Sequence, residues 1–78
     1  MSSSVVFSRV VRDARSKLGL SQEELADRCD LHRNAIGLIE RGERSPSLDT
    51  ILAIAGGLDI SASRLVSRVE RELEAQSR

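Results

Sequence analysis

The chain has 78 residues, 40% of them apolar, and its twelve basic side chains balance its twelve acidic ones. That length allows one small domain and disfavours an enzyme with a deep pocket, while the apolar content excludes a disordered chain. No apolar run approaches the ~20 residues of a membrane span, and we expect no signal peptide. One cysteine, Cys29, excludes an internal disulfide and a thiolate zinc site. We therefore expect a cytoplasmic module that uses no cofactor, metal or membrane.

The first two predicted helices follow from apolar spacing and their flanking residues. Apolar side chains recur every three or four positions across residues 7–18, and Gly19 then ends the first helix. Ser21 and Glu24 have the spacing of a capping box, in which each side chain bonds the other residue's backbone. The second helix therefore opens at Ser21, and it closes at Asp30.

Capping residues, glycines and the single proline mark the elements in the rest of the chain. They predict a third helix at about 32–41, a loop at 43–47, a fourth helix from 48 to the Gly56–Gly57 pair, and a fifth over about 61–76. We expect the serines at positions 2–4 to form a mobile terminus. The tail from 74 to 78 is expected to fray. Five helices and no strand make the predicted fold all-α.

Residues 21–42, SQEELADRCDLHRNAIGLIERG, have the pattern of two short helices joined by a tight turn. Ala26 is the small residue that lets such helices cross closely. The side chains expected to anchor the pair on the core are Leu25, Cys29, Leu31, Ile36 and Ile39. The second helix is then free on its outer face, which carries Arg33, Asn34, Gly37, Leu38 and Arg41. Because Arg can bind guanine and Asn can bind adenine through two hydrogen bonds, this face predicts reading of the DNA major groove.

Residues 7–65 resemble the Xre/Cro/CI family of helix-turn-helix DNA-binding proteins through SQEELA, LHRNAIGLIERG and PSLDTILAIAGGLDISASRL. The resemblance implies a five-helix, lambda-repressor-like DNA-binding domain that forms a homodimer and binds double-stranded operator DNA. Among short family members, the length and the bare C-terminal helix resemble restriction–modification controller proteins. We expect residues 1–78 to form one domain.

The resemblance also implies roles for single residues. The expected base-reading positions are Arg33, Asn34, Ala35, Gly37 and Leu38. The expected phosphate contacts, from the resemblance and from the helix ends, are Ser21, Gln22, His32, Arg41 and Arg44. Leu38 is left open between a thymine-methyl contact and no contact. Arg15 and Glu40 match an ion pair that braces the recognition helix.

Four residues depart from the family pattern. Asp30 and Asp59 stand at turn positions that usually hold glycine, and we expect both in the left-handed backbone region. His32 replaces the usual Asp, Ser or Thr cap of the recognition helix, so that cap should be weaker. Gly37 within the helix costs about 1 kcal/mol relative to Ala.

The charge balance limits the strength of DNA binding. Residues 1–47 hold eight basic and seven acidic side chains, so the predicted DNA-binding half is barely basic. Most of the acids fall on the first two helices, and Glu40 is expected to be paired, which leaves Arg33, Arg41 and Arg44 on the DNA side. Few phosphates are then neutralised per protomer, so non-specific binding should be weak.

The last helix carries more apolar residues than a small core requires. Leu65 and Val66 can complete the core, whereas Val69 and Leu73 lie further out and have less of the domain to cover them. We expect a symmetric dimer contact through the fourth and fifth helices, formed by Leu58, Ile60, Val66, Val69 and Leu73. This contact would set two recognition helices one DNA turn, ~34 Å, apart.

The predicted function is a homodimeric, sequence-specific transcriptional regulator that acts on a palindromic or near-palindromic operator. The alternative is an antitoxin or protein-interaction module whose C-terminal helix binds a protein partner. An apolar patch at 69–73 that does not self-associate would favour this alternative. An enzyme is disfavoured because the sequence offers no nucleophile with a base, no paired carboxylates and no metal-ligand spacing.

Overall fold

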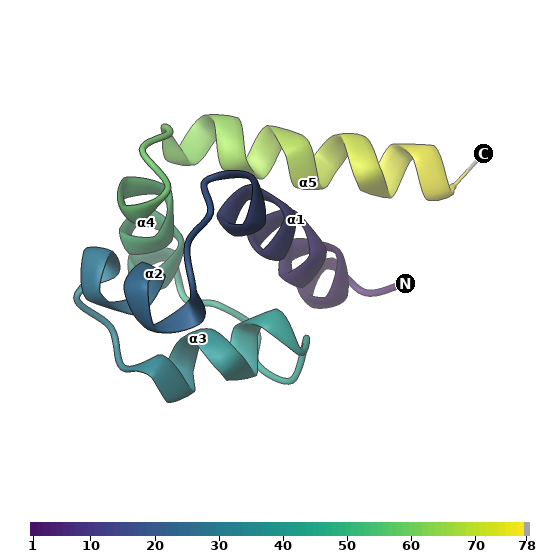
Figure 1. Ribbon diagram of the computed structural model, residues 1–78. Coiled ribbons are helices and arrows are strands. Elements are labelled where there is room, and N and C mark those ends of the chain that lie inside the picture. Colours follow the sequence, from purple (N-terminus) through teal and green to yellow (C-terminus); the bar gives the residue numbers. More distant parts are fainter. Residues whose placement is uncertain (78) are drawn as a thin grey trace.

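The computed structural model describes residues 1–77, which fold into five α-helices joined by short loops (Figure 1). The helices are α1 (Ser3–Lys17), α2 (Gln22–Cys29), α3 (Arg33–Glu40), α4 (Leu48–Gly57) and α5 (Ala62–Gln76). The predicted all-α class and the order of the five helices are confirmed. The helix α1 packs against α5 on one side and against α3 on the other, while α2 packs against α3 and α4 (Figure 1).

Each helix begins with a side chain that accepts a hydrogen bond from a free backbone N–H of the first turn. The capping box of α2 is present: Ser21 Oγ accepts from the Glu24 N–H at 3.0 Å, and Glu24 Oε1 accepts from the Ser21 N–H at 2.9 Å. His32 caps α3 through its ring, because Nδ1 accepts from the Asn34 N–H at 3.1 Å. Asp30 and Asp59 adopt the expected left-handed conformation, with φ of 56° and 60°.

The expectations for both chain ends are wrong. Ser2 caps α1 by accepting from the Val5 N–H at 3.2 Å, and the serines at 3 and 4 lie inside the helix. A single serine oxygen is enough to start the helix here because the next turn packs on the core at Val6. The tail is helical to Gln76, since Leu73 packs against the core and gives the last turns a tertiary contact. Arg78, the last residue of the predicted fraying tail, lies outside the described residues.

The core lies between the five helices, and its fully buried members come from every helix. They are Val6, Val11, Leu25, Ile36, Ile39, Ile54 and Leu65. Ala26 is 2% exposed, as expected for the small residue at the crossing of α2 and α3. A second close approach joins α2 to α4, because a Cβ atom added at Gly57 would lie 2.4 Å from Cys29 Sγ. This crossing fixes the back of the helix-turn-helix unit on the rest of the fold.

None of the described helices is long and apolar enough to cross a membrane by itself. Only α4 and α5 taken together reach the necessary length and composition, and they are bent by 104° relative to each other.

Candidate nucleic-acid interface

The helix α3 has a buried inner face and an exposed outer face. Its inner face consists of Ile36 and Ile39, which are 0% and 1% exposed and pack in the core. Its outer face begins with Arg33 and Asn34, both of which are exposed. Asn34 lies on the side of the eight-residue helix opposite Ile36 and Ile39 and so faces solvent, while Arg33 is exposed as the first residue of the helix.

The exposed face of α3 borders a hollow of about 470 Å³. Its lining combines four predicted base-reading residues with two predicted phosphate contacts: Arg33, Asn34, Gly37, Leu38, Gln22 and Arg41. The structure therefore brings together side chains from α2, from α3 and from the residue that ends α3. The lining is mainly polar and cationic, which suits the edge of a nucleic acid better than an apolar ligand.

Four predicted contact residues lie outside this hollow. Ala35 is half-buried on the side of α3. His32 lines a separate hollow together with Arg33 and Asp27. Ser21 and Arg44 are exposed, Ser21 as the cap of α2 and Arg44 in the loop after α3. Arg44 makes no ion pair with any residue in 1–77, so its charge is available to an anion.

Gly37 lies on the outer face of α3 but is buried. The Arg41 side chain causes this burial, because a Cβ atom added at Gly37 would lie 3.1 Å from Arg41 Nη1. Long side chains on a helix lean toward its N-terminus, so Arg41 reaches back over the residue one turn earlier. The expectation of an open glycine on this face is therefore wrong.

Arg15 and Glu40 meet between α1 and the end of α3. Arg15 Nε donates to Glu40 Oε2 at 2.6 Å, and Arg15 Nη2 donates to Glu40 Oε1 at 2.9 Å. Glu40 is only 3% exposed, and the Arg15 side chain is 15% exposed. The hydrogen bond to Glu40 raises the pKa of Arg15. A two-point pair of this kind holds α3 on α1 and keeps the Glu40 charge away from the outer face.

Two further contacts to Glu40 were not predicted from the sequence. Gln22 Nε2 donates to Glu40 Oε1 at 3.1 Å, and Arg12 Nη2 donates to the Glu40 carbonyl at 3.2 Å. The ends of α1, α2 and α3 therefore share one carboxylate and its backbone carbonyl. Helical periodicity places Arg12 and Arg15 three residues apart on one face of α1, which was the available signal for the Arg12 contact.

Cys29 does not act as a reactive group in this arrangement. It is 6% exposed beneath Gly57, and burial raises the pKa of its thiol. Among residues 1–77, no group of three or more His, Cys, Asp or Glu side chains is placed to hold a metal ion. The outer face of α3 therefore offers hydrogen-bonding groups and charge.

The predicted dimer residues fall into two groups. Leu58 and Val69 are 3% and 8% exposed and belong to the core of the single chain. Ile60 and Leu73 are half-buried, and Val66 is 39% exposed. Sequence reasoning missed two more exposed apolar residues, Leu48 (69%) and Leu52 (51%), which lie one turn apart on α4. The exposed apolar surface therefore includes α4, whereas the sequence pattern emphasised the last helix.

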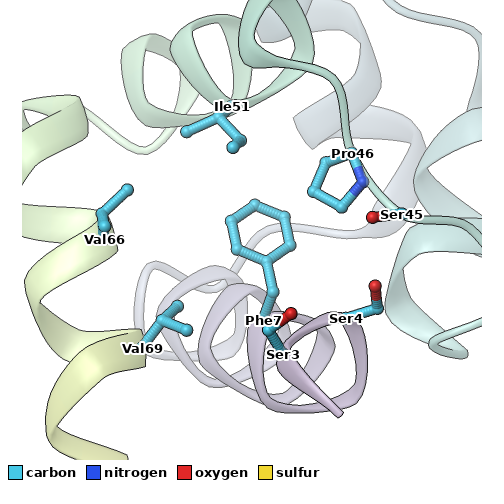
Figure 2. A pocket seen from close by; sticks show the side chains of 8 residues that line it. All are labelled: Ser3, Ser4, Phe7, Ser45, Pro46, Ile51, Val66 and Val69. Atoms are coloured by element: carbon cyan, nitrogen blue, oxygen red, sulfur yellow. The ribbon is translucent and has the colours of Figure 1, made fainter.

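An apolar pocket of about 190 Å³ lies beside this surface. Figure 2 shows the Phe7 ring of α1 pointing between Ile51 of α4, Pro46 of the preceding loop, and Val66 and Val69 of α5. The pocket thus joins the start of α1 to the same pair of helices that carries the exposed leucines.

Comparison with known proteins agrees with this geometry. Residues 11–65 match the helix-turn-helix family. The control protein C.BamHI of Bacillus amyloliquefaciens is 46% identical over 63 residues, which cover 80% of this chain and 78% of the relative. The restriction-modification controller C.AhdI from Aeromonas hydrophila has a similar structure, with a TM-score of 0.77 and 44% identity over 80% of this chain and 94% of that one. The controller C.Esp1396I, solved as a tetramer with its natural 35 base-pair operator, superposes with a TM-score of 0.85 and 28% identity over 92% of this chain and 95% of that one.

The family match and these relatives identify the protein as a DNA-binding transcriptional regulator, and the family is one of regulators rather than enzymes. The chain belongs to the helix-turn-helix family of the Xre type, and its relatives include restriction–modification controller proteins.

Proposed function

We propose that the protein is a cytoplasmic, homodimeric regulator that binds a palindromic or near-palindromic operator through α3. The observation that carries this proposal is the exposed Arg33–Asn34 edge on a helix whose other face is fully buried. The Arg15–Glu40 pair supports the same reading, because it fixes the direction of this edge from a second helix. A rigidly held helix with hydrogen-bonding side chains at its exposed end suits the major groove.

The proposed contacts divide by their chemistry. Base edges are read by Arg33, Asn34, Ala35 and Leu38, with the two hydrogen-bonding side chains supplying most of the discrimination, whereas Gly37 is covered by the Arg41 side chain and lends space to this face. Phosphates are contacted by Ser21, Gln22, His32 and Arg44. Gln22 has one amide hydrogen on Glu40 and a second one free, so it can bridge the braced carboxylate to a phosphate.

The homodimer is proposed to form through α4 and α5. Ile60, Val66 and Leu73 supply surface, whereas Leu58 and Val69 support it from within the core. The exposed Leu48 and Leu52 extend this surface along α4. The related controller C.Esp1396I was solved as a tetramer on its operator, which supports assembly through surfaces other than α3.

Selection of bound duplexes from a random pool tests the function directly. We expect enrichment of an inverted repeat whose half-sites lie about one helical turn apart. Arg33→Ala should cost about 1–3 kcal/mol on that site and relax the preference at one base pair per half-site. Arg71→Ala, which removes a charge from α5, is the matched control. Retention of full operator preference by Arg33→Ala would show that the assigned face is wrong.

Sedimentation tests the dimer. Val66→Asp places a charge on the exposed part of the α4–α5 surface, and we expect it to halve the mass of the particle while the helical content stays the same. Val69→Asp is unsuitable, because Val69 is buried and the variant would unfold. A wild-type protein that sediments as a monomer would contradict the homodimer and favour the alternative, an interaction module that binds another protein through the same apolar surface.

A further inference from the structure

Arg41 has an unusual position for a residue at the end of the recognition helix. Its guanidinium lies over Gly37, with Nη1 3.1 Å from the point where a Cβ atom at that position would stand. This places the charged group against the middle of the outer face of α3, beside Asn34 and Leu38 in the lining of the same hollow.

The orientation of the guanidinium is set by Glu43. Arg41 Nε is hydrogen-bonded and ion-paired to Glu43 Oε2, and both side chains are more than half exposed. Arginine carries five N–H donors, so this contact leaves the two terminal nitrogens, Nη1 and Nη2, with free donors. Those two nitrogens form the fork that fits a pair of neighbouring acceptors such as O6 and N7 of guanine.

The charge of the pair also argues against a phosphate role. A phosphate contact gains from an unpaired cation, as at Arg44, whereas the Arg41–Glu43 pair has no net charge. Bringing the Glu43 carboxylate to the DNA backbone would add repulsion.

We propose that Arg41 is a base-reading residue, that Glu43 positions it, and that Gly37 supplies the space in which its guanidinium lies. The target is a guanine whose two major-groove acceptors face the middle of α3. This inference rests on the proposed function, since it assigns a further specificity-determining residue to the same DNA face. It replaces the phosphate role that the family resemblance implied for Arg41.

Gly37 gives the inference a sharp test. A methyl group at 3.1 Å from Nη1 forces the guanidinium away by a few tenths of an ångström, yet Ala is a better helix residue than Gly. Gly37→Ala should therefore keep or raise the thermal stability of the protein while lowering its preference for guanine at one base pair. If Gly37 served only the packing of the protein, Gly37→Ala would lower the thermal stability and leave the preference for guanine unchanged.

The experiment measures binding to the selected operator, to variants at each base pair, and to unrelated duplex over a range of salt concentration. Arg41→Ala/Glu43→Gln, which removes both charges of the neutral pair, should reduce the preference at one base pair per half-site by about 5- to 150-fold and leave the salt dependence nearly unchanged. Arg41→Ala alone should show the same loss of preference. Glu43→Gln should weaken the same preference and steepen the salt dependence, because Arg41 becomes an unpaired cation. Arg44→Ala is the control: it should weaken all sequences alike and reduce the salt slope by about one unit.

Three results would overturn the inference. Arg41→Ala/Glu43→Gln could weaken every sequence equally and lower the salt slope as Arg44→Ala does, which would return Arg41 to phosphate while leaving the proposed function intact. Gly37→Ala and Glu43→Gln could leave the base preference of a folded protein unchanged, which would remove their positioning roles. A wild-type protein that enriches no duplex sequence would overturn both the proposed function and this inference.

Discussion

The Arg15–Glu40 pair offers the most informative perturbation, because the two partners differ in burial. Glu40 is 3% exposed and cannot reach water if Arg15 is removed, whereas Arg15 is 15% exposed and also donates to the Leu20 carbonyl at 2.7 Å. Breaking a buried pair by removing one partner costs about 3–5 kcal/mol when the remaining charge stays buried. We therefore expect Arg15→Met, which keeps the apolar stem, to lose about that much stability.

Removing the other partner should cost less. Glu40→Leu leaves Arg15 with its bond to Leu20 and with access to solvent, and we expect a loss of about 1–3 kcal/mol. The double variant Arg15→Met/Glu40→Leu leaves no buried charge, so its loss should fall short of the sum of the single losses by about 1–3 kcal/mol. Against a total stability of about 5–15 kcal/mol, these differences are large enough to measure.

Urea unfolding followed by far-ultraviolet circular dichroism is the suitable assay, because the chain has no Trp or Tyr for fluorescence. Each variant should be measured at two protein concentrations, since a dimer contributes to apparent stability by mass action. The hydrogen bond to Glu40 raises the pKa of Arg15 above its ordinary value. The stability that Arg15 contributes is therefore complete at any pH below the ordinary arginine pKa, and it is lost only as the pH rises above that pKa. The cost of Arg15→Met should therefore be constant from about pH 6 to 9. A loss below about 1 kcal/mol, or additive single losses, would refute the reasoning.

Two further predictions concern local packing and capping. Gly57→Ala should lower the free energy of unfolding by about 1–2 kcal/mol, because its Cβ would collide with Cys29 Sγ. Gly56→Ala has open space around it and should raise that free energy by about 0.5–1 kcal/mol. Equal chemical-unfolding midpoints for the two variants would contradict this. The pKa of Glu24 is lowered by the backbone N–H of the capping serine, so its contribution is present above its ordinary pKa of 4.5 and is lost as the pH falls through its lower folded value. Glu24→Gln should therefore lose less stability on acidification than the wild type. The measurement is the thermal unfolding midpoint as a function of pH, with Glu23→Gln as the control. Matching acid profiles for Glu24→Gln and the wild type would argue against the cap.

Much of the fold follows from local patterns. The helices, the capping box at Ser21 and the left-handed turns at Asp30 and Asp59 each depend on a few neighbouring residues, so short-range rules were sufficient to predict them. The outer and inner faces of α3 follow from the helical period in the same way. The chain ends were mispredicted because helix formation at a terminus depends on packing with distant segments.

The sequence by itself determined the five helices, the Arg33–Asn34 edge and its family, because periodicity, caps and motif spacing are local properties of the chain. Only the tertiary structure decided which apolar residues are buried and which remain outside. Val69 fills the core, and Leu52 is exposed. A repeating pattern tells which residues share a helix face, but the neighbour that covers the face is set by how the helices cross, which depends on residues far apart in the chain.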